Sequence, residues 1–396
     1  MLIKWFAGLI AAAAFGGLAG CSTPCGANGG LCAPALANTS APPAVQQGAV
    51  PAPAAAPAPA ATPSPEASTR IALLLPLRSE ALGAASEALR DGFMAAWERD
   101  RSGFEVDLIA TGDAPQDALD AYAGAVARHD IIVGPLARPA VGALASSARL
   151  IRPTLALNHP DTPGALPRPM LAIGLSIEDE ARAVAQWGAR DYPHGRALVL
   201  AGPAAWQQRI ANAFAARWAQ LGHTSERVEL AVADGYVNPT ALGELRTRLE
   251  IDRPELLFAA LDAGELRQLR GALGTAIACY GTSSVNPGHE PGAAVAELDG
   301  VRMLDLPWEV QPDHPAVMVY PRRLTDGSAL DLDRLYALGI DAFRLAREVA
   351  LHPGAAFTLD GVTGRLAVDP AASGFTRTEA AVVYRDGAFE PATSKP

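Results

Sequence analysis

From residue 70 onward, continuous apolar runs alternate along the chain with stretches whose apolar residues recur at helical spacing. Residues 71–77 (IALLLPL) form a continuous apolar run, which is typical of a strand buried on both faces of a parallel sheet. The next stretch predicts a helix over 80–97, with Leu89 and Phe93 near one face. The alternation continues, and we expect further strands at 105–109, 131–133 and 154–157 and further helices at 113–128 and 141–150.

The same rhythm restarts after an extended segment at 171–175. Local signals mark two helix starts, because Ser176 opens the capping sequence SIED and Asn238 is followed by proline. Asp113 is expected to cap an earlier helix in the same way. The second set of expected elements comprises helices at 176–191, 205–221, 239–250 and 264–273 and strands at 197–201, 227–232, 256–260 and 275–280.

The C-terminal part does not complete a third set. It carries an expected strand at 301–304, a loop around 307–308, a long helix at 330–351 and short strands at 365–368 and 381–384. These pieces suit a chain that crosses back between two lobes and completes them. The predicted fold class is therefore α/β with two lobes, each a mostly parallel sheet flanked by helices. The first lobe is expected over about 69–175 plus about 305–355, and the second over about 176–304 plus the C-terminal strands.

The N-terminal segment is typical of an export signal. Lys4 precedes an apolar run that breaks at the glycines of positions 16 and 17, whereas a membrane span needs ~20 apolar residues. Cys21 follows Leu-Ala-Gly, the pattern of a bacterial lipobox, and an ordinary signal peptide is the alternative. We expect a signal peptide over 1–20, a lipidated Cys21, and a disordered Ala/Pro-rich tether up to residue 68.

The composition limits which partners the chain can bind and which catalytic chemistry it can carry out. The formal net charge of −10 argues against nucleic acid as a partner and against a basic membrane-binding surface. Lys4 and Lys395 are the two lysines, so the folded part has none for a Schiff base or a phosphate-binding loop. The sequence has no GxSxG or HExxH motif, and its 7 histidines lack metal-ligand spacing. We expect no catalytic residue, no metal site and no cofactor.

The other cysteines differ in their expected surroundings. Cys25 and Cys32 lie in the tether, where they can close a small disulfide loop in an oxidising compartment or remain two free thiols. Cys279 lies in the apolar run 276–280, and we expect a buried, unreactive thiol there.

A series of short segments also occurs in a characteristic order and spacing. In sequence these are 71–77 (IALLLPL), 89–93 (LRDGF), 133–136 (VGPL), 155–158 (LALN), 176–182 (SIEDEAR), 280–283 (YGTS), 299–301 (DGV), 305–308 (DLPW), 335–343 (LYALGIDAF) and 359–366 (LDGVTGRL). Together they resemble the LppC/LpoA family of lipoproteins. The resemblance covers nearly the whole chain after the tether.

This resemblance implies a type I periplasmic-binding-protein-like fold and a regulatory function. Members of the family are outer-membrane lipoproteins that face the periplasm, bind a class A penicillin-binding protein and stimulate its transpeptidase activity. The implied partners are therefore that peptidoglycan synthase, the outer membrane through the lipid anchor, and peptidoglycan itself, and the chain is not expected to be an enzyme. The best-known members carry an N-terminal helical-repeat domain where this sequence has its tether.

A ligand of such a fold lies between the lobes, at the carboxyl ends of the strands. The alternative is that side chains at these positions cap helices and close turns. The hydroxyl cluster at 282–284 also leaves open a second function, a periplasmic receptor for an amino acid or similar small solute. The candidate ligand-binding residues are Arg78, Ser79, Asn158, Asp262, Thr282, Ser283 and Ser284.

Two aromatic residues are candidates for contact with a protein partner. Trp308 lies in the expected loop at 307–308, and Tyr236 follows Asp-Gly in an expected turn. Exposed aromatic side chains are frequent anchors of protein interfaces. We expect both side chains to be exposed.

Overall fold

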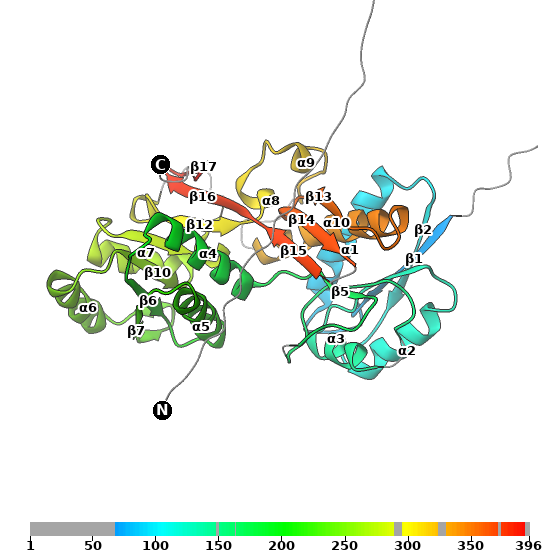
Figure 1. Cartoon of the computed structure of the whole chain (residues 1–396), viewed down its shortest axis with the longest axis horizontal. Coiled ribbons are helices and arrows are strands. Elements are labelled where there is room, and N and C mark those ends of the chain that lie inside the picture. Colours follow the sequence, from blue (N-terminus) through cyan, green and yellow to red (C-terminus); the bar gives the residue numbers. More distant parts are fainter. Residues whose placement is uncertain are drawn as a thin grey trace, which may run out of the picture. The chain divides into compact units, whose positions relative to one another are not determined.

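The computed structural model describes residues 68–147, 150–162, 164–288, 295–323, 330–370 and 374–392. The signal peptide, Cys21, Cys25, Cys32 and nearly all of the tether lie outside the described residues. Pro63–Pro396 forms one compact unit, which contains two α/β lobes (Figure 1). Within the described part of the chain, no helix is both long and apolar enough to cross a membrane.

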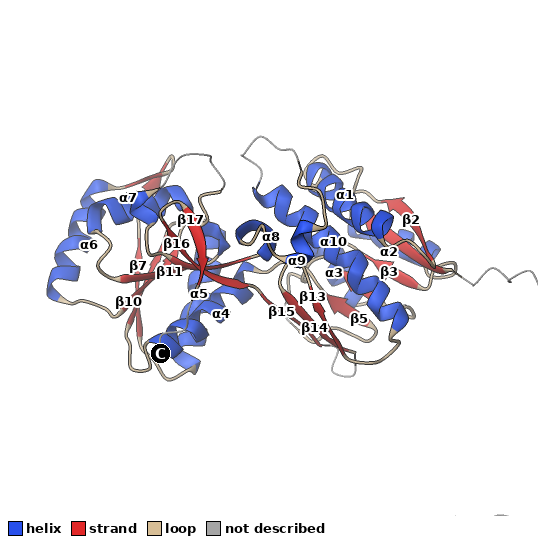
Figure 2. Cartoon of the chain, turned by 90° about the horizontal axis from the view of Figure 1, so that it is seen from above, coloured by secondary structure: helices blue, strands red, loops and turns tan. Residues whose placement is uncertain are grey.

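The first lobe is built on a parallel sheet with the strand order β2-β1-β3-β4-β5 within the described residues. Helices cover both of its faces (Figure 2). The strands are β1 (Thr69–Leu75), β2 (Phe104–Ala110), β3 (Ile131–Val133), β4 (Thr154–Ala156) and β5 (Met170–Ala172). The helices are α1 (Gly83–Arg99) and α10 (Leu330–Leu351) on one face, and α2 (Pro115–Ala125) and α3 (Arg138–Ala145) on the other.

This arrangement explains the continuous apolar run of the first strand. Ile71 and Leu73 point into the core formed with α1 and α10, and Ala72 and Leu74 point into the core formed with α2 and α3. Because both faces of β1 are covered, neither face carries polar residues over these positions.

Helices α1 and α10 pack closely at two glycines. A Cβ added to Gly92 would lie 1.9 Å from the carbonyl oxygen of Tyr336. One added to Gly339 would lie 2.1 Å from a backbone carbonyl oxygen of α1. The missing side chains let the two backbones touch, and Phe93 and Phe343 then meet edge to face with ring centroids 5.4 Å apart.

The second lobe has a larger sheet, with the order β17-β16-β12-β11-β10-β6-β7 among the described strands. Strands β16 and β17 run antiparallel to their neighbours, and the other pairs are parallel. The strands are β6 (Ala197–Ala201), β7 (Ser225–Glu229), β10 (Leu256–Ala260), β11 (Ala278–Gly281), β12 (Arg302–Asp305), β16 (Ala380–Arg385) and β17 (Ala388–Pro391). Helices α4 (Ile177–Asp191) and α5 (Ala205–Gln220) cover one face, and α6 (Pro239–Ile251) and α7 (Ala263–Leu273) the other. A small hairpin, β8 (Val232–Ala233) with β9 (Tyr236–Val237), precedes α6.

Between described residues, the chain passes from one lobe to the other at three crossings. These lie between β5 and α4, between β12 and α8 (Pro307–Val310), and between β15 (Gly374–Thr378) and β16 (Figure 1). The short helix α9 (Pro315–Met318) follows α8 in the first lobe. The two-lobed α/β fold expected from the sequence is confirmed.

One assignment of the C-terminal strands is wrong. Strand β14 (Arg365–Asp369) pairs with β13 (Phe357–Asp360) and β15 in a separate antiparallel sheet. Its Leu366 and Val368 belong to the core of the first lobe, whereas the sequence analysis placed this strand in the second. The apolar positions of so short a strand do not indicate which of the two cores they join.

The expected helix starts are partly confirmed. The Ser176 hydroxyl accepts a hydrogen bond from the Asp179 N–H at 3.2 Å, and Asn238 Oδ1 accepts one from the Thr240 N–H at 2.8 Å. Asp113 does not cap α2, because Pro115 takes the first helical position and makes residue 114 the N-cap.

Candidate ligand cleft between the lobes

A cavity of about 730 Å³ lies where the two lobes face each other. Strands β10 and β11 end beside it, where a ligand of this class of sheet binds. Its apolar lining consists of Leu175, Ile177, Trp206, Leu306, Leu330, Leu332 and Leu335. Its polar lining consists of Glu180, Asp262, Ser283, Ser284 and Asn286, with Asp331 and Arg334 from α10.

The structure brings three predicted second-lobe residues to the cavity, but their polar atoms are used within the lobe. Asp262 caps α7, accepting a hydrogen bond from a backbone N–H of that helix at 2.8 Å. The hydroxyl of Ser284 donates to a carbonyl just after β10 at 2.8 Å, and the N–H of Ser283 donates to a buried glutamate. Thr282 is fully buried and caps the short helix that follows it. Capping, the alternative expected from the sequence, accounts for the contacts of Asp262 and Thr282, whereas the Ser284 hydroxyl ties its loop to the end of β10.

The predicted first-lobe residues do not line this cavity. Ser79 is buried, and its hydroxyl accepts a hydrogen bond from the Leu82 N–H at 2.8 Å. Asn158 Nδ2 donates to the Leu136 carbonyl at 3.1 Å, which ties two loops together. Arg78 has an exposed side chain. These three residues shape the loops of the first lobe at the ends of its strands.

An ion pair that the sequence analysis missed joins the lobes at the β12 crossing. Arg334 of α10 and Asp305 at the end of β12 approach to 2.8 Å, and the same guanidinium donates to the Ser283 carbonyl at 3.0 Å. Asn286 Nδ2 and the Leu306 N–H donate to the other lone pairs of the carboxylate at 2.7 and 2.8 Å. Burial opposes the charge of Arg334, but the carboxylate of Asp305 outweighs it and the pKa of Arg334 is raised. The pair is fully hydrogen-bonded, which is the condition for a buried ion pair to persist.

Glu180 is a second missed residue of the cleft. It lies on α4 with an exposed fraction of 4%, and its carboxyl accepts the Ser283 N–H at 2.8 Å. Burial raises the pKa of Glu180, and the negative charges of Glu379 and Asp305 raise it further. Glu180 and Asp305 both occur in the segments that resemble the family, yet neither segment indicates that they lie at the same hinge.

Metal-ligating and thiol side chains are the other groups of the described residues that could carry chemistry. No group of three or more His, Cys, Asp or Glu side chains there has the arrangement of a metal site. Cys279 is buried as expected, and burial raises its pKa to about 11, which keeps the thiol protonated.

The aromatic candidates for partner contact differ in exposure. Tyr236 is 73% exposed at the β8–β9 hairpin. Trp308 is 1% exposed, and its expected place in an exposed loop is wrong. It lies in α8, packed against Tyr336 at 5.4 Å between ring centroids and under the Arg322 guanidinium at 4.2 Å. Trp308 is therefore part of the first-lobe core.

The model of a family described as "LppC putative lipoprotein" matches residues 53–238 and 243–379. This chain belongs to the LppC lipoprotein family. The match includes both lobes and the crossings between them. The resemblance seen in the short sequence segments is confirmed.

Curated relatives of this LppC protein are named penicillin-binding protein activator LpoA. The one from Vibrio cholerae is 27% identical over 345 residues, which cover 76% of this chain and 54% of that protein. The one from Haemophilus influenzae is 28% identical over 340 residues, which cover 82% of this chain and 55% of that protein. The chain thus spans about half the length of the curated relatives it matches. Their names describe regulators, not enzymes.

Solved structures similar to this LppC protein share its two-lobed fold. One, described as a "putative branched-chain amino acid ABC transporter" from Chromobacterium violaceum, is 35% identical with a TM-score of 0.66, covering 80% of this chain and 100% of that one. Full-length LpoA from H. influenzae is 25% identical with a TM-score of 0.66, and the match covers 83% of this chain and 59% of that one. The C-domain of the same LpoA, described as a regulator of PBP1A, is 24% identical with a TM-score of 0.63, covering 82% and 100%.

Proposed function

We propose that this chain is an envelope lipoprotein that binds a class A penicillin-binding protein and stimulates its transpeptidase activity. The observation that carries the proposal is membership of the LppC family, together with curated relatives named as activators over 76% and 82% of this chain. The chain acts by contact and has no chemistry of its own. Asp262 and Thr282 are engaged in caps, Ser284 in a hydrogen bond to the loop after β10, and Arg334 in an interlobe ion pair. These contacts support a role in which the domain holds a defined surface.

The proposed location is the periplasmic side of the outer membrane. Cys21 supplies the lipid anchor, and a tether of this length, fully extended at ~3.1 Å per residue, reaches on the order of 140 Å. The lobes can therefore work far from the membrane that holds them. We expect the chain to incorporate a labelled fatty acid in cells and Cys21→Ser to abolish this incorporation. Incorporation of the label by the Cys21 variant would contradict anchoring through Cys21.

The proposed partner surface includes Tyr236. Among the described residues, Tyr236 is the aromatic one of the large apolar side chains that are exposed. Aromatic side chains of this kind contribute large contact area at interfaces. The buried Trp308 is not part of this proposal.

The deciding experiment is transpeptidation by a purified class A synthase with and without residues 22–396, the mature chain less its lipidated Cys21. We expect a saturable increase in the fraction of cross-linked peptides, and no change in products when the chain is incubated with sacculi alone. A synthase whose cross-linking is unchanged at saturating chain, with no crosslinked complex, would refute the activator function. Turnover of sacculi by the chain alone would refute the absence of enzyme activity.

The cleft gives a second candidate function, a receptor for a small amine-bearing solute. The cavity of about 730 Å³ falls within the size range of small-ligand pockets, and Glu180 places a carboxyl group in its wall. Such a receptor gains stability from its ligand, so its melting temperature rises with ligand concentration. A screen of amino acids that leaves the melting temperature unchanged would eliminate this candidate.

A further inference from the structure

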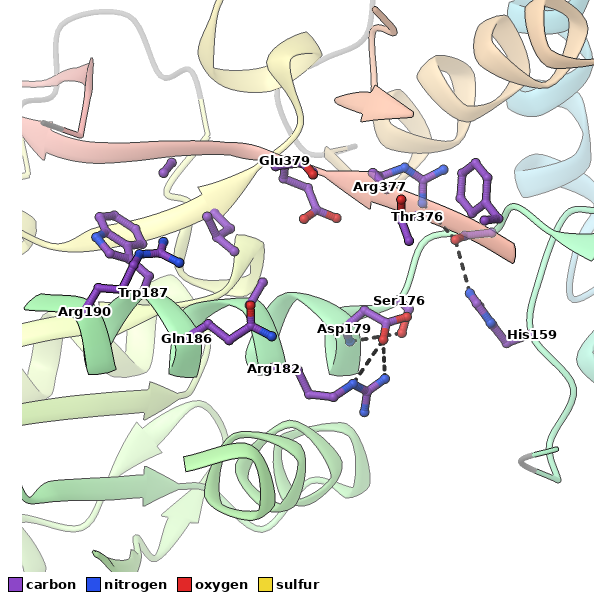
Figure 3. Close-up of a pocket in the computed structure, with 16 residues that line it drawn as sticks. His159, Ser176, Asp179, Arg182, Gln186, Trp187, Arg190, Thr376, Arg377 and Glu379 are labelled. Atoms are coloured by element: carbon purple, nitrogen blue, oxygen red, sulfur yellow. Dashed lines mark hydrogen bonds and ion pairs between the residues drawn. The ribbon is translucent and has the colours of Figure 1, made fainter. Parts of the chain in front are cut away.

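A second cavity, of about 520 Å³, lies on a different face of α4 and shares no lining residue with the cleft. Figure 3 shows it between α4 on one side and the β15–β16 crossing on the other. We call it the α4 pocket. Along α4, Ile177 and Glu180 belong to the cleft, whereas Asp179, Gln186 and Arg190 belong to the α4 pocket. The two cavities are thus separated by the helix itself.

Two charged side chains of the α4 pocket have hydrogen-bonding capacity that no other described residue uses. Glu379 lies on the crossing between β15 and β16, and its carboxylate points into the pocket (Figure 3). Arg190 lies near the C-terminal end of α4, beside Trp187 (Figure 3). Within the described part of the chain, neither group makes a hydrogen bond or ion pair with another residue. A partly enclosed carboxylate such as Glu379 loses hydration without gaining a hydrogen-bond donor, which makes it a candidate for ligand contact, and the exposed Arg190 guanidinium is free to bind a ligand at the rim.

The other charged groups of the pocket are already engaged. Arg182 is paired with Asp179, one turn before it on α4. Arg377 donates to the carbonyls of Ile173 and Gly174 at 2.7 and 2.9 Å. Among the described residues that line the pocket, the Glu379 carboxylate and the Arg190 guanidinium are the charged groups left to bind a ligand by hydrogen bonds. A ligand that matches both carries one positive and one negative group.

The surface between these two charges is largely apolar and elongated. Trp187 and Ala183 of α4 face Leu304 and Ala381 of the sheet. The lining follows α4 from its N-cap Ser176 to Arg190, which corresponds to roughly 21 Å at 1.5 Å per residue. An extended peptide rises about 3.3 Å per residue, so up to about six residues fit along the whole lining, and a shorter peptide spans the part between Glu379 and Arg190 (Figure 3).

We propose that the α4 pocket binds a short zwitterionic peptide, with its ammonium group at Glu379 and its terminal carboxylate at Arg190. A guanidinium binds a carboxylate through two parallel hydrogen bonds, and a carboxylate accepts one or two of the three donors of an ammonium group. Burial raises the pKa of Glu379, and the positive charge of a bound ammonium group would offset this by stabilising the ionised carboxylate.

The pocket also contacts two of the three crossings between the lobes. Gly174 and Ser176 belong to the first crossing and Glu379 to the last, and Arg377 ties these two crossings together. A peptide that touches both crossings binds best to one arrangement of the hinge. Peptide binding therefore favours the arrangement of the crossings described above.

The test is calorimetric titration of residues 22–396 with trialanine at pH 7.5, which does not involve a synthase and is independent of the proposed function. We expect saturable binding that weakens at least tenfold when the peptide ends are blocked, as in N-acetyl-trialanine amide. We also expect Glu379→Gln and Arg190→Gln each to weaken binding at least tenfold. Arg190 is exposed, so its variant keeps the fold if the Glu379 variant does not.

Matched controls separate this pocket from general charge effects and from the cleft. Glu250→Gln and Arg246→Gln change exposed side chains of α6, and Trp206→Ala changes the cleft. We expect all three to bind trialanine as the unchanged chain does. No binding at 5 mM trialanine, equal binding of the blocked peptide, unchanged binding by both pocket variants, or loss of binding with Trp206→Ala would each overturn the proposal.

A second titration distinguishes the source of the peptide. The probe is the cell-wall tripeptide L-Ala-γ-D-Glu-meso-diaminopimelate, which carries one ammonium and two carboxylates more than trialanine. Binding of this tripeptide at least tenfold more tightly than trialanine supports the pocket and assigns it to peptidoglycan stem peptides. Equal binding of both supports the pocket and assigns it to short periplasmic peptides in general.

Discussion

Arg334 Nη2 and Asp305 Oδ2 lie 2.8 Å apart and join α10 of the first lobe to the end of β12. The Asp305 side chain is 0% exposed, and the Arg334 side chain is 12% exposed. The same guanidinium reaches the Ser283 carbonyl in the second lobe. The Arg334–Asp305 pair therefore links the two lobes where the chain crosses from β12 to α8.

Removing one partner of this pair leaves the other charge buried without compensation. We expect Asp305→Asn to lower the free energy of unfolding by roughly 3–5 kcal/mol, measured by urea denaturation. The matched control is Asp331→Asn, because Asp331 also pairs with Arg334 but its side chain is 96% exposed. We expect little change in the control. Equal losses in the two variants would contradict the special role of the buried pair.

The contact between α1 and α10 predicts a strong dependence on residue size. Gly92→Ala places a methyl group 1.9 Å from the Tyr336 carbonyl oxygen, so the helices must separate. We expect a loss of about 1–3 kcal/mol or more in the free energy of unfolding. Gly243→Ala is the control, because Gly243 of α6 has open space around it and alanine favours helix by about 0.5–1 kcal/mol. A Gly92→Ala variant as stable as this control would show that the helices do not pack as described.

We expect the buried carboxyl of Glu309 to make the free energy of unfolding fall as the pH rises. Its Oε1 atom is buried without a hydrogen bond to any described residue, and burial, followed by the charge of Asp305, raises its pKa from 4.5 to about 8. Between these values the folded protein holds a proton that the unfolded chain has lost. Stability contributed by this group is therefore largest below pH 4.5 and falls by about 1.4 kcal/mol per pH unit up to about pH 8.

The substitution Glu309→Gln removes this titration. We expect the fall in the free energy of unfolding between pH 5.5 and 8 to become shallower, measured by urea denaturation at each pH. The exposed Glu250→Gln serves as the control and should leave the slope unchanged. An equally steep fall in the Glu309 variant would show that this carboxyl is ionised in the folded protein.

We expect a substitution of Tyr236 to weaken partner binding without changing the stability of the fold. Because its side chain is 73% exposed, Tyr236→Ala should change the free energy of unfolding by less than about 0.5 kcal/mol. Under the proposed function, we expect the same variant to weaken association with the synthase at least tenfold, measured by surface-immobilised binding. Met318→Ala, at a 68% exposed residue of α9, is the control on the first lobe. Unchanged association of the Tyr236 variant would place the contact elsewhere.

Local sequence determined most of the elements and several of their boundaries. The run at 71–77 predicted a strand covered on both sides, and β1 has that environment. Ser176 and Asn238 predicted helix starts, because a cap depends on residues only two or three positions apart. The prediction at Asp113 was wrong for an equally local reason, since Pro115 fixes the first helical position.

Burial of individual side chains depended on contacts that local sequence does not contain. Trp308 follows a proline and was expected in an exposed loop. Its ring is covered by Tyr336 of α10 and by Arg322, which come from later parts of the chain. The hydrophobic pattern of four residues cannot indicate that such cover exists.

The sequence by itself determined the fold class, the family resemblance and the expectation of an anchored chain. Only the tertiary structure decided which charged residues act together. Glu180, Asp305, Arg334 and Glu379 lie on four separate elements or crossings, and each has an ordinary local context in the sequence. They meet because the chain passes between the lobes three times within the described residues. Electrostatic interaction depends on distance and burial, and both are set by those crossings.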